Sequence, residues 1–231
     1  MSSSAPLVLL SSMAAREVLR ELATAHTQAG GAAVEARAAG GVDVAKRVRA
    51  GERLDVVVLA GNVIDELLAE GHLTGHRIDL VRSGVGIAVP SGRGRPDVGS
   101  EAAVREAVLA APTISFSTGP SGTYLRKLFE RWGIGEIVKD RIVIPPPGVP
   151  VGSLVAEGKA ALGFQQLSEL INVPGIQVLG PLPDAIQQMT VFSGGVARTS
   201  ADAAAALALL KFMAAPAADG VKRRFGMESM A

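Results

Sequence analysis

Short polar turns after apolar runs are the part of this sequence best suited to chemistry. Ser11, Ser12 and Met13 follow the apolar run that starts at Leu7, and Ser121-Gly122-Thr123 follows a second run that ends at Phe116. In an open α/β sheet, the carboxyl ends of strands meet helix N-termini, whose free N–H groups and partial positive charge bind anions. A serine in such a turn adds a hydroxyl donor. For one serine alone, a helix cap worth about 1 kcal/mol is the better explanation. Two such turns, one in each half of the chain, favour an anion site.

Other residues add to this predicted site, each with a simpler explanation beside it. Gly40-Gly41 precedes a predicted helix and offers bare amides, although an ordinary tight turn explains it equally well. Arg82 suits bidentate pairing with a carboxylate, or an ion pair with Asp79 on the surface. Gln165-Gln166 ends an apolar strand, where alternation lets one of the two side chains reach a ligand. Gly122 is expected to let a ligand approach the backbone closely.

The sequence contains no recognisable catalytic machinery. It lacks a nucleophile elbow, a P-loop and a histidine beside a promising serine or acid, so the catalytic residues stay unassigned. Modest proton transfer is the remaining chemistry, with Glu169, Tyr124 and His76 as its candidates. A surface or packing role is the favoured explanation for each of the three.

Composition excludes several classes of function. The 231 residues contain 23 Lys+Arg against 22 Asp+Glu and no basic cluster with interleaved aromatics, so we expect no nucleic-acid partner. The absence of cysteine excludes disulfides and thiolate zinc sites. His72 and His76 stand at helical spacing, but Gly71 and Gly75 among polar neighbours predict a solvated loop. We therefore expect no metal and no cofactor.

The most apolar segment and the N-terminus bear on membranes and export. Residues 203–215 are interrupted by Lys211 and followed by Pro216, so they are too short to span a bilayer and predict a core helix. The first residues lack a basic region followed by an apolar one. As written, the sequence predicts a cytoplasmic protein, or a periplasmic one if a signal peptide has been removed.

Strand and helix patterns alternate along the chain. Apolar runs predict strands at 7–10, 33–38, 54–59, 85–89, 113–116, 142–144, 161–164, 178–183 and 189–197. Helical spacing predicts helices at 13–25, 44–48, 62–70, 102–110, 124–132, 151–157, 201–214 and around Val221. This order predicts α/β architecture with doubly wound, mostly parallel sheets, and the Gly/Pro/Arg-rich residues 90–99 predict a boundary between two lobes.

The order of these motifs resembles the type II periplasmic binding proteins, in their molybdate-binding branch. The resemblance rests on Leu-Leu-Ser11-Ser12-Met13, on Gly40-Gly41 with residues 45–52, on residues 54–59, on residues 121–125 and on Leu-Gly-Phe-Gln165-Gln166. It covers nearly the whole chain and implies two Rossmann-like lobes joined by a two-strand hinge near Val89 and Thr190. Residues 1–89 with 190–231 would form lobe I, and residues 90–189 would form lobe II.

The resemblance also implies where a ligand would be held. Carried over by position, the family's oxyanion contacts fall on Ser11 or Ser12, Gly41, Ser121, Val149 and Gln166. Molybdate binders tend to have a serine-rich second turn and a tyrosine after the later strand, where this chain has Gly40-Gly41 and Gln165-Gln166. This difference favours a larger organic anion over molybdate.

Three hypotheses follow from the resemblance. The first is a binding protein that captures an organic polycarboxylate or oxyanion between its lobes, with an ABC importer membrane complex as a partner. The second is an isomerase like the aconitate isomerases of the same branch, which residues 180–187, Gln165-Gln166 and residues 168–170 resemble. The third, an effector-sensing domain, is weaker because no DNA-binding segment is attached.

Overall fold

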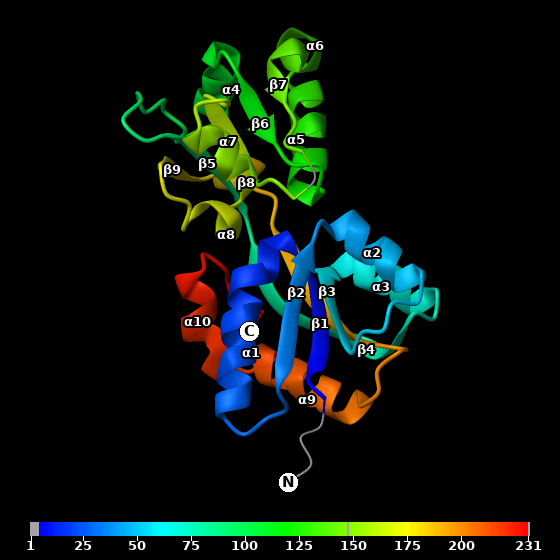
Figure 1. The fold of residues 1–231 in the computed structure, drawn as a ribbon. Coiled ribbons are helices and arrows are strands. Elements are labelled where there is room, and N and C mark those ends of the chain that lie inside the picture. Colours follow the sequence, from blue (N-terminus) through cyan, green and yellow to red (C-terminus); the bar gives the residue numbers. More distant parts are fainter. Residues whose placement is uncertain (1–4, 147, 231) are drawn as a thin grey trace. The chain divides into compact units, whose positions relative to one another are not determined.

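The protein divides into two compact units in the computed structural model, which describes residues 5–146 and 148–230. Unit 1 consists of Met1–Arg82 and Val191–Ala231, and unit 2 consists of Ser83–Thr190. Each unit is an α/β structure with one five-stranded mixed sheet (Figure 1). The chain passes between the units twice, between Arg82 and Ser83 and between Thr190 and Val191.

Unit 1 is built on the strand order β2-β1-β3-β10-β4. Strand β1 pairs in parallel with β2 and β3, and β10 runs antiparallel to β3. Its elements in chain order are β1 (Leu7–Ser12), η1 (Met13–Ala15), α1 (Arg16–Gln28), β2 (Val34–Ala39), α2 (Gly41–Arg49), β3 (Val56–Ala60), α3 (Gly61–Ala69), β4 (Leu73–Ser83), β10 (Thr190–Ala197), α9 (Ala203–Ala214), η4 (Pro216–Ala218) and α10 (Asp219–Arg224).

Helices cover both faces of this sheet, as alternation along β1 requires. Leu7 and Leu9 pack in one core cluster with residues of α1 and α9. Leu10 points to the other face and packs with residues of α2 and α3. Every residue of the central strand β3 is buried, which is typical of a strand covered on both faces.

Unit 2 is built on the strand order β7-β6-β8-β5-β9. Strand β6 pairs in parallel with β7 and β8, and β5 runs antiparallel to β8 and β9. Its elements in chain order are β5 (Val85–Pro90), α4 (Glu101–Ala110), β6 (Ile114–Phe116), α5 (Pro120–Arg131), α6 (Gly135–Val138), η2 (Lys139–Arg141), β7 (Ile142–Val143), α7 (Val151–Ala156), β8 (Leu162–Gln166), α8 (Leu167–Leu170), β9 (Ile176–Pro181) and η3 (Asp184–Ile186).

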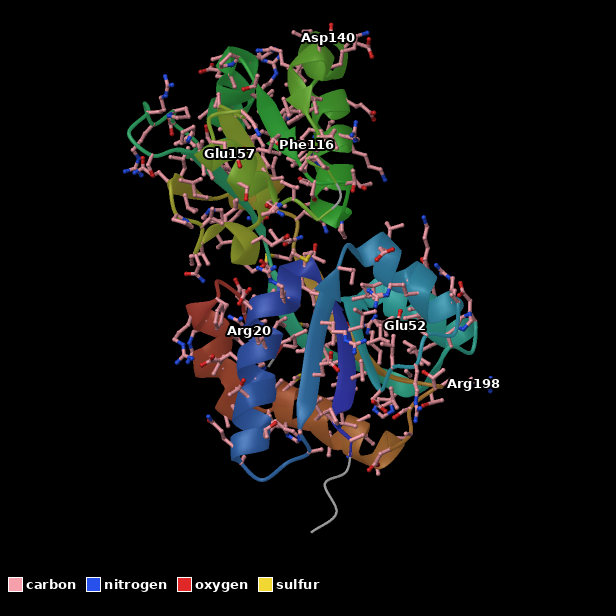
Figure 2. All side chains as sticks on the ribbon, viewed as in Figure 1. Arg20, Glu52, Phe116, Asp140, Glu157 and Arg198 are labelled. Atoms are coloured by element: carbon pink, nitrogen blue, oxygen red, sulfur yellow. The ribbon has the colours of Figure 1, made fainter. Side chains whose placement is uncertain are left out.

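Aromatic side chains form the centre of unit 2. Phe129 of α5 meets Phe116 and Phe164 edge to face, with ring centroids 5.9 and 6.3 Å apart, and Trp132 stacks on Phe129. Phe116, labelled in Figure 2, is fully buried at the end of β6. The cluster packs the last turn of α5 against β6 and β8.

Two sequence-based expectations about organisation are wrong. The first chain crossing lies between Arg82 and Ser83 rather than near Val89, because β5 pairs with β8 and β9 inside the sheet of unit 2. Residues 72–76 were expected to form a solvated loop, but Leu73–Ser83 is the edge strand β4. The first half of β4 is exposed, so it shows no alternation of apolar and polar residues from which a strand could be predicted. It also contains Gly75, which has a positive φ of 76° and is a residue type typical of turns.

The apolar C-terminal segment packs inside unit 1, since α9 contributes Leu209, Leu210 and Met213 to the core. Within the described part of the chain, no single helix has the length and apolarity needed to cross a membrane. Helices 203–214 and 216–224 meet that requirement only as a pair, bent by 61° at the break between them.

Candidate functional site

The first cluster of candidate residues lies at the carboxyl edge of the unit 1 sheet and consists of Ser12, Gly40 and Gly41. Ser12 ends β1 directly opposite Ala39, the last residue of β2. Gly40 follows, and α2 begins at Gly41. Alternation places the Ser12 side chain on the face of Leu10, which is the face that α2 and α3 cover.

The Ser12 hydroxyl is buried and lacks a partner. The residue is 8% exposed, and its Oγ makes no hydrogen bond within the described residues. It also makes no capping bond to the 3₁₀ helix that follows, so the explanation of Ser12 as a helix cap is wrong. A buried, unpaired polar group costs about 1–3 kcal/mol, which makes this hydroxyl a candidate ligand donor.

At the opposite edge of the same sheet, the Asp55 carboxylate has several hydrogen-bond partners. Asp55, just before β3, accepts hydrogen bonds from the Val8 amide at 2.8 Å, the Ser200 hydroxyl at 2.7 Å and the Ala201 amide at 3.1 Å. Unit 1 thus pairs the buried carboxylate at its amino edge and leaves the Ser12 hydroxyl unpaired at its carboxyl edge.

Neither glycine of the first cluster is required by the fold. Gly40 and Gly41 have no positive φ. A Cβ at Gly40 would meet nothing within 4 Å, and one at Gly41 would meet only Leu59 at 3.8 Å. The two glycines leave the first amides of α2 unshielded, as a site for an anion at a helix N-terminus needs.

Ser11 and Met13 differ from Ser12. Ser11 points to the opposite sheet face, and its Oγ donates to the Ser12 carbonyl oxygen at 3.1 Å. Met13 begins the short helix η1 and is half-buried. Of these three predicted residues, Ser12 is the one with an unpaired buried hydroxyl.

The second cluster is the name given to two contacting pairs in unit 2, Ser117 with Ser121 and Gln165 with Glu169. Ser117 follows β6, and Ser121 occupies the first turn of α5, where it is 2% exposed. Their hydroxyl oxygens are 3.4 Å apart. Gly119 is the residue that caps α5, and no side chain caps this helix, so Ser121 is not a helix cap.

Gly122 and Thr123 have structural explanations. A Cβ at Gly122 would lie 1.6 Å from the Ser117 carbonyl oxygen, so the glycine allows α5 to approach its own preceding loop. The expectation that Gly122 serves the approach of a ligand is not needed to explain it. Thr123 is exposed, and its amide donates to the Gly119 carbonyl oxygen at 3.0 Å.

Gln165 and Gln166 point to opposite faces and have different surroundings, as alternation predicts. The Gln166 amide is satisfied when its Nε2 donates to the Ser83 and Gly84 carbonyl oxygens and its Oε1 accepts from Thr190. It therefore ties together the two segments where the chain enters and leaves unit 2. The Gln165 Nε2 donates to Glu169 Oε1 at 2.7 Å, while its own Oε1 is buried without a partner.

Arg82 and Val149 have other partners than those expected. Arg82 forms an ion pair with Glu228 at 2.7 Å rather than with Asp79, because the backbones of Arg82 and Glu228 pair as an isolated bridge. Asp79 instead binds Arg77 and Ser193. The Val149 amide donates to the Pro146 carbonyl oxygen at 3.0 Å, which occupies the donor that a ligand would use.

The three candidate proton carriers separate clearly. The Tyr124 hydroxyl donates to the Ile186 carbonyl oxygen at 2.7 Å, and burial raises the pKa of Tyr124 above 10.0, which makes it a packing residue. His76 is exposed on β4. Glu169 is half-buried against Gln165 and is the candidate that lies in a cluster. In the described part of the chain, no three acidic or histidine residues are grouped closely enough to hold a metal ion.

Sequence reasoning missed Ser117 as a site residue and overlooked the contact between Gln165 and Glu169. Ser117 was visible as the first polar residue after an apolar run, the same signal that identified Ser12. Gln165 and Glu169 are four residues apart, but a strand ends and a one-turn helix begins between them. Neither the helical repeat nor the strand repeat therefore predicted their contact.

Comparisons with known proteins agree with this architecture. The periplasmic molybdate-binding protein of Azotobacter vinelandii superposes with a TM-score of 0.78 at 20% identity, and the match covers 96% of this chain and 98% of that one. The sulfate-binding protein of Mycobacterium tuberculosis superposes with a TM-score of 0.74 at 16% identity, covering 98% and 88%. The fold is that of the type II periplasmic binding proteins.

Sequence comparison assigns the family. An aconitate isomerase from a Pseudomonas species is 40% identical over 155 residues, which cover 65% of this chain and 58% of that relative's length. The profile of the bacterial extracellular solute-binding proteins matches residues 7–228. A match over almost the full length means that this chain belongs to the bacterial extracellular solute-binding protein family.

Proposed function

We propose that the protein binds a small organic anion with several carboxylates through hydroxyl and amide donors of the kind found in the first and second clusters. The observation that carries the proposal is the buried, unpaired Ser12 hydroxyl beside the unshielded amides of Gly40 and Gly41. Hydroxyls and helix N-terminal amides are donors, so their preferred ligand is an anionic oxygen. The Ser117–Ser121 pair supplies hydroxyls of the same kind in unit 2.

The aconitate isomerase relative is 40% identical to this chain, and its name points to a polycarboxylate. It therefore favours a polycarboxylate over a simple oxyanion as the ligand. The structures named for molybdate and sulfate are 20% and 16% identical, and they bear on the fold alone.

A thermal-shift screen tests the proposal, because a ligand that binds the folded state raises the melting temperature by mass action. The screen compares aconitate, citrate and dicarboxylates with molybdate, tungstate and sulfate at equal concentrations. We expect a tricarboxylate or dicarboxylate to shift the midpoint more than molybdate does. A selective response to molybdate, or no response to any carboxylate, would contradict the proposal.

A second candidate function is isomerisation of an unsaturated polycarboxylate. Two observations favour it: the aconitate isomerase relative, and the position of Glu169 at 2.7 Å from Gln165 in the second cluster. A carboxylate beside a bound polycarboxylate is a suitable group to move a proton between its carbons. Incubation with cis-aconitate, followed by proton NMR, separates the two functions, since a binding protein leaves cis-aconitate unchanged.

The family description places its members outside the cytoplasm. We extend the proposal to a periplasmic location and to delivery of the bound anion to an ABC importer. Fractionation of cells that express the native gene tests the location, and a periplasmic protein is the expected result. Recovery in the cytoplasmic fraction would contradict both the location and the importer as a partner.

A further inference from the structure

The outer side of strand β2 is an open edge of the unit 1 sheet. Within the described residues, β2 is the outermost strand and pairs with β1 alone (Figure 1). Proteins usually protect such an edge with proline, a bulge or charged side chains. The sequence of β2, VEARAA, has no proline, and its pairing with β1 runs in register through the whole strand. Its two charged residues, Glu35 and Arg37, are opposite in sign and form an ion pair at 2.8 Å on one face of the strand.

The direction of the backbone along β2 follows from one hydrogen bond. The Leu7 amide donates to the Ala33 carbonyl oxygen at 2.8 Å, so the backbone groups of Ala33 face β1. Successive residues of a strand direct these groups to opposite sides, so those of Glu35 and Arg37 face β1 as well. The amides and carbonyls that point outward are those of the alternate residues, Val34, Ala36 and Ala38.

The face of β2 beside α1 leaves room for an added strand. Two cavities of about 380 and 320 Å³ lie between α1 and β2, and Arg20 and Ala36 line both of them. Apart from Arg37, the residues of β2 that line these cavities are small or β-branched, namely Val34, Ala36 and Ala38. The cavities therefore form a groove along the open edge, beside the backbone groups that point outward.

Charge favours a second copy of β2 as the occupant of this edge. In antiparallel pairing about a two-fold axis at Ala36, Glu35 lies opposite Arg37 of the other copy. The outward backbone groups then meet in hydrogen-bonded pairs, and the two charges fall in the closer, non-hydrogen-bonded pairs, where opposite charges attract. An axis at Val34 or Ala38 would place alanine opposite one of the charges. Parallel pairing in register would place like charges together.

We propose that the protein forms a two-fold symmetric dimer through antiparallel pairing of β2 with β2 of a second copy, in which Glu35 and Arg37 pair across the interface. The inference concerns one edge of unit 1 and does not depend on the proposed anion. Specific, stable interfaces bury about 1,200–2,000 Å² in total, more than one short strand and its groove offer. The dimer is therefore weak and depends on protein concentration.

Sedimentation equilibrium without ligand tests the dimer over a series of chain concentrations up to about 1 mM. We expect the average mass to rise from that of one chain toward that of two. Glu35→Arg places arginines opposite arginines, and Arg37→Glu places acids opposite acids. Each variant alone is expected to dimerise about tenfold more weakly or worse. An equimolar mixture of the two variants places arginines opposite acids again, so we expect it to form dimers as the unmodified protein does.

A proline substitution tests the backbone pairing separately from the charges. The Ala36 amide points outward, so Ala36→Pro removes a donor from the interface and none from the pairing with β1. We expect this variant to keep the circular dichroism spectrum of the unmodified protein and to lose the dimer. A dimer of unchanged strength in Ala36→Pro would contradict pairing through β2.

An ion pair of the same spacing in unit 2 supplies the matched control. Glu157, labelled in Figure 2, pairs with Lys159 at 2.6 Å, and both side chains are exposed. Glu157→Arg makes the same change of charge as Glu35→Arg and is expected to leave dimerisation unchanged. An equal loss in both variants would show that net charge, and not β2, controls the association.

Three further results would overturn the proposal. The first is the mass of a single chain at every concentration, which would leave the edge open to a strand of a different protein. The second is a dimer that persists in both charge variants, because it would then use another surface. The third is a mixture of the two variants that stays monomeric, because the pairing of Glu35 with Arg37 requires it to recover.

Discussion

The two clusters are built from different chemistry. In unit 1, Ser12 and the amides at Gly40 and Gly41 form a set of donors. In unit 2, Ser117 and Ser121 supply hydroxyls, and the Gln165 amide donates to the Glu169 carboxylate. The first cluster therefore consists of donors alone, whereas the second combines hydroxyl donors with a carboxylate acceptor. A donor set suits any anionic oxygen, so we expect the first cluster to contribute more to anion affinity than the second.

Glycine substitutions should give the largest contrast between the clusters. At Gly122, a Cβ would overlap the Ser117 carbonyl oxygen, so Gly122→Ala should lower the free energy of unfolding by about 3 kcal/mol or more. Urea denaturation measures this loss. At Gly41 there is room for a Cβ, so Gly41→Ala should change stability by less than about 1 kcal/mol while it weakens anion binding. An equal loss of stability in both variants would show that Gly41, too, serves the fold.

Neighbouring glutamines should separate folding from binding in the same way. Gln166 satisfies Ser83, Gly84 and Thr190, so Gln166→Met leaves buried polar groups unpaired and should lower the free energy of unfolding by about 2–3 kcal/mol. Gln165→Met removes one hydrogen bond to Glu169 and should cost about 1 kcal/mol. Denaturation of the two variants in parallel checks the order. A larger loss at Gln165 would reverse the roles assigned to the pair.

Serine substitutions should affect binding more than stability. Ser12→Ala removes a buried hydroxyl without a partner, so the free energy of unfolding should be unchanged or higher by about 1 kcal/mol. Loss of a hydrogen bond to an anion costs about 1.5 kcal/mol, which is roughly a tenfold weaker Kd. Ser121→Ala should weaken binding similarly, with a small loss of stability because it contacts Ser117 at 3.4 Å. Calorimetry and denaturation together test both, and a loss of stability without a loss of affinity would indicate purely structural serines.

The smallest expected effect lies outside both clusters and concerns the pH dependence of stability. His26 is buried against Gly31 and the edge of Phe212, and burial lowers the pKa of His26 below 6.5. The unfolded chain then binds more protons at mildly acidic pH, so stability should fall as pH decreases below about 6.5. His26→Phe should remove this part of the pH dependence of the melting temperature. An unchanged dependence would mean that other groups cause it.

The sequence predicted what local patterns determine. Alternating strands and helices, the serine at the end of β1 and the opposite directions of Gln165 and Gln166 all follow from short-range periodicity. Contacts between distant segments were not predictable. Arg82 and Glu228 pair across 146 residues, and Gln166 binds segments that only the folded sheet brings to it.

Calorimetric titration of Ser12→Ala and Ser121→Ala with trans-aconitate, beside the unmodified protein, tests most directly whether these buried serine hydroxyls hold an anion. The account predicts a Kd about tenfold weaker in each variant. An unchanged Kd in both variants would contradict it.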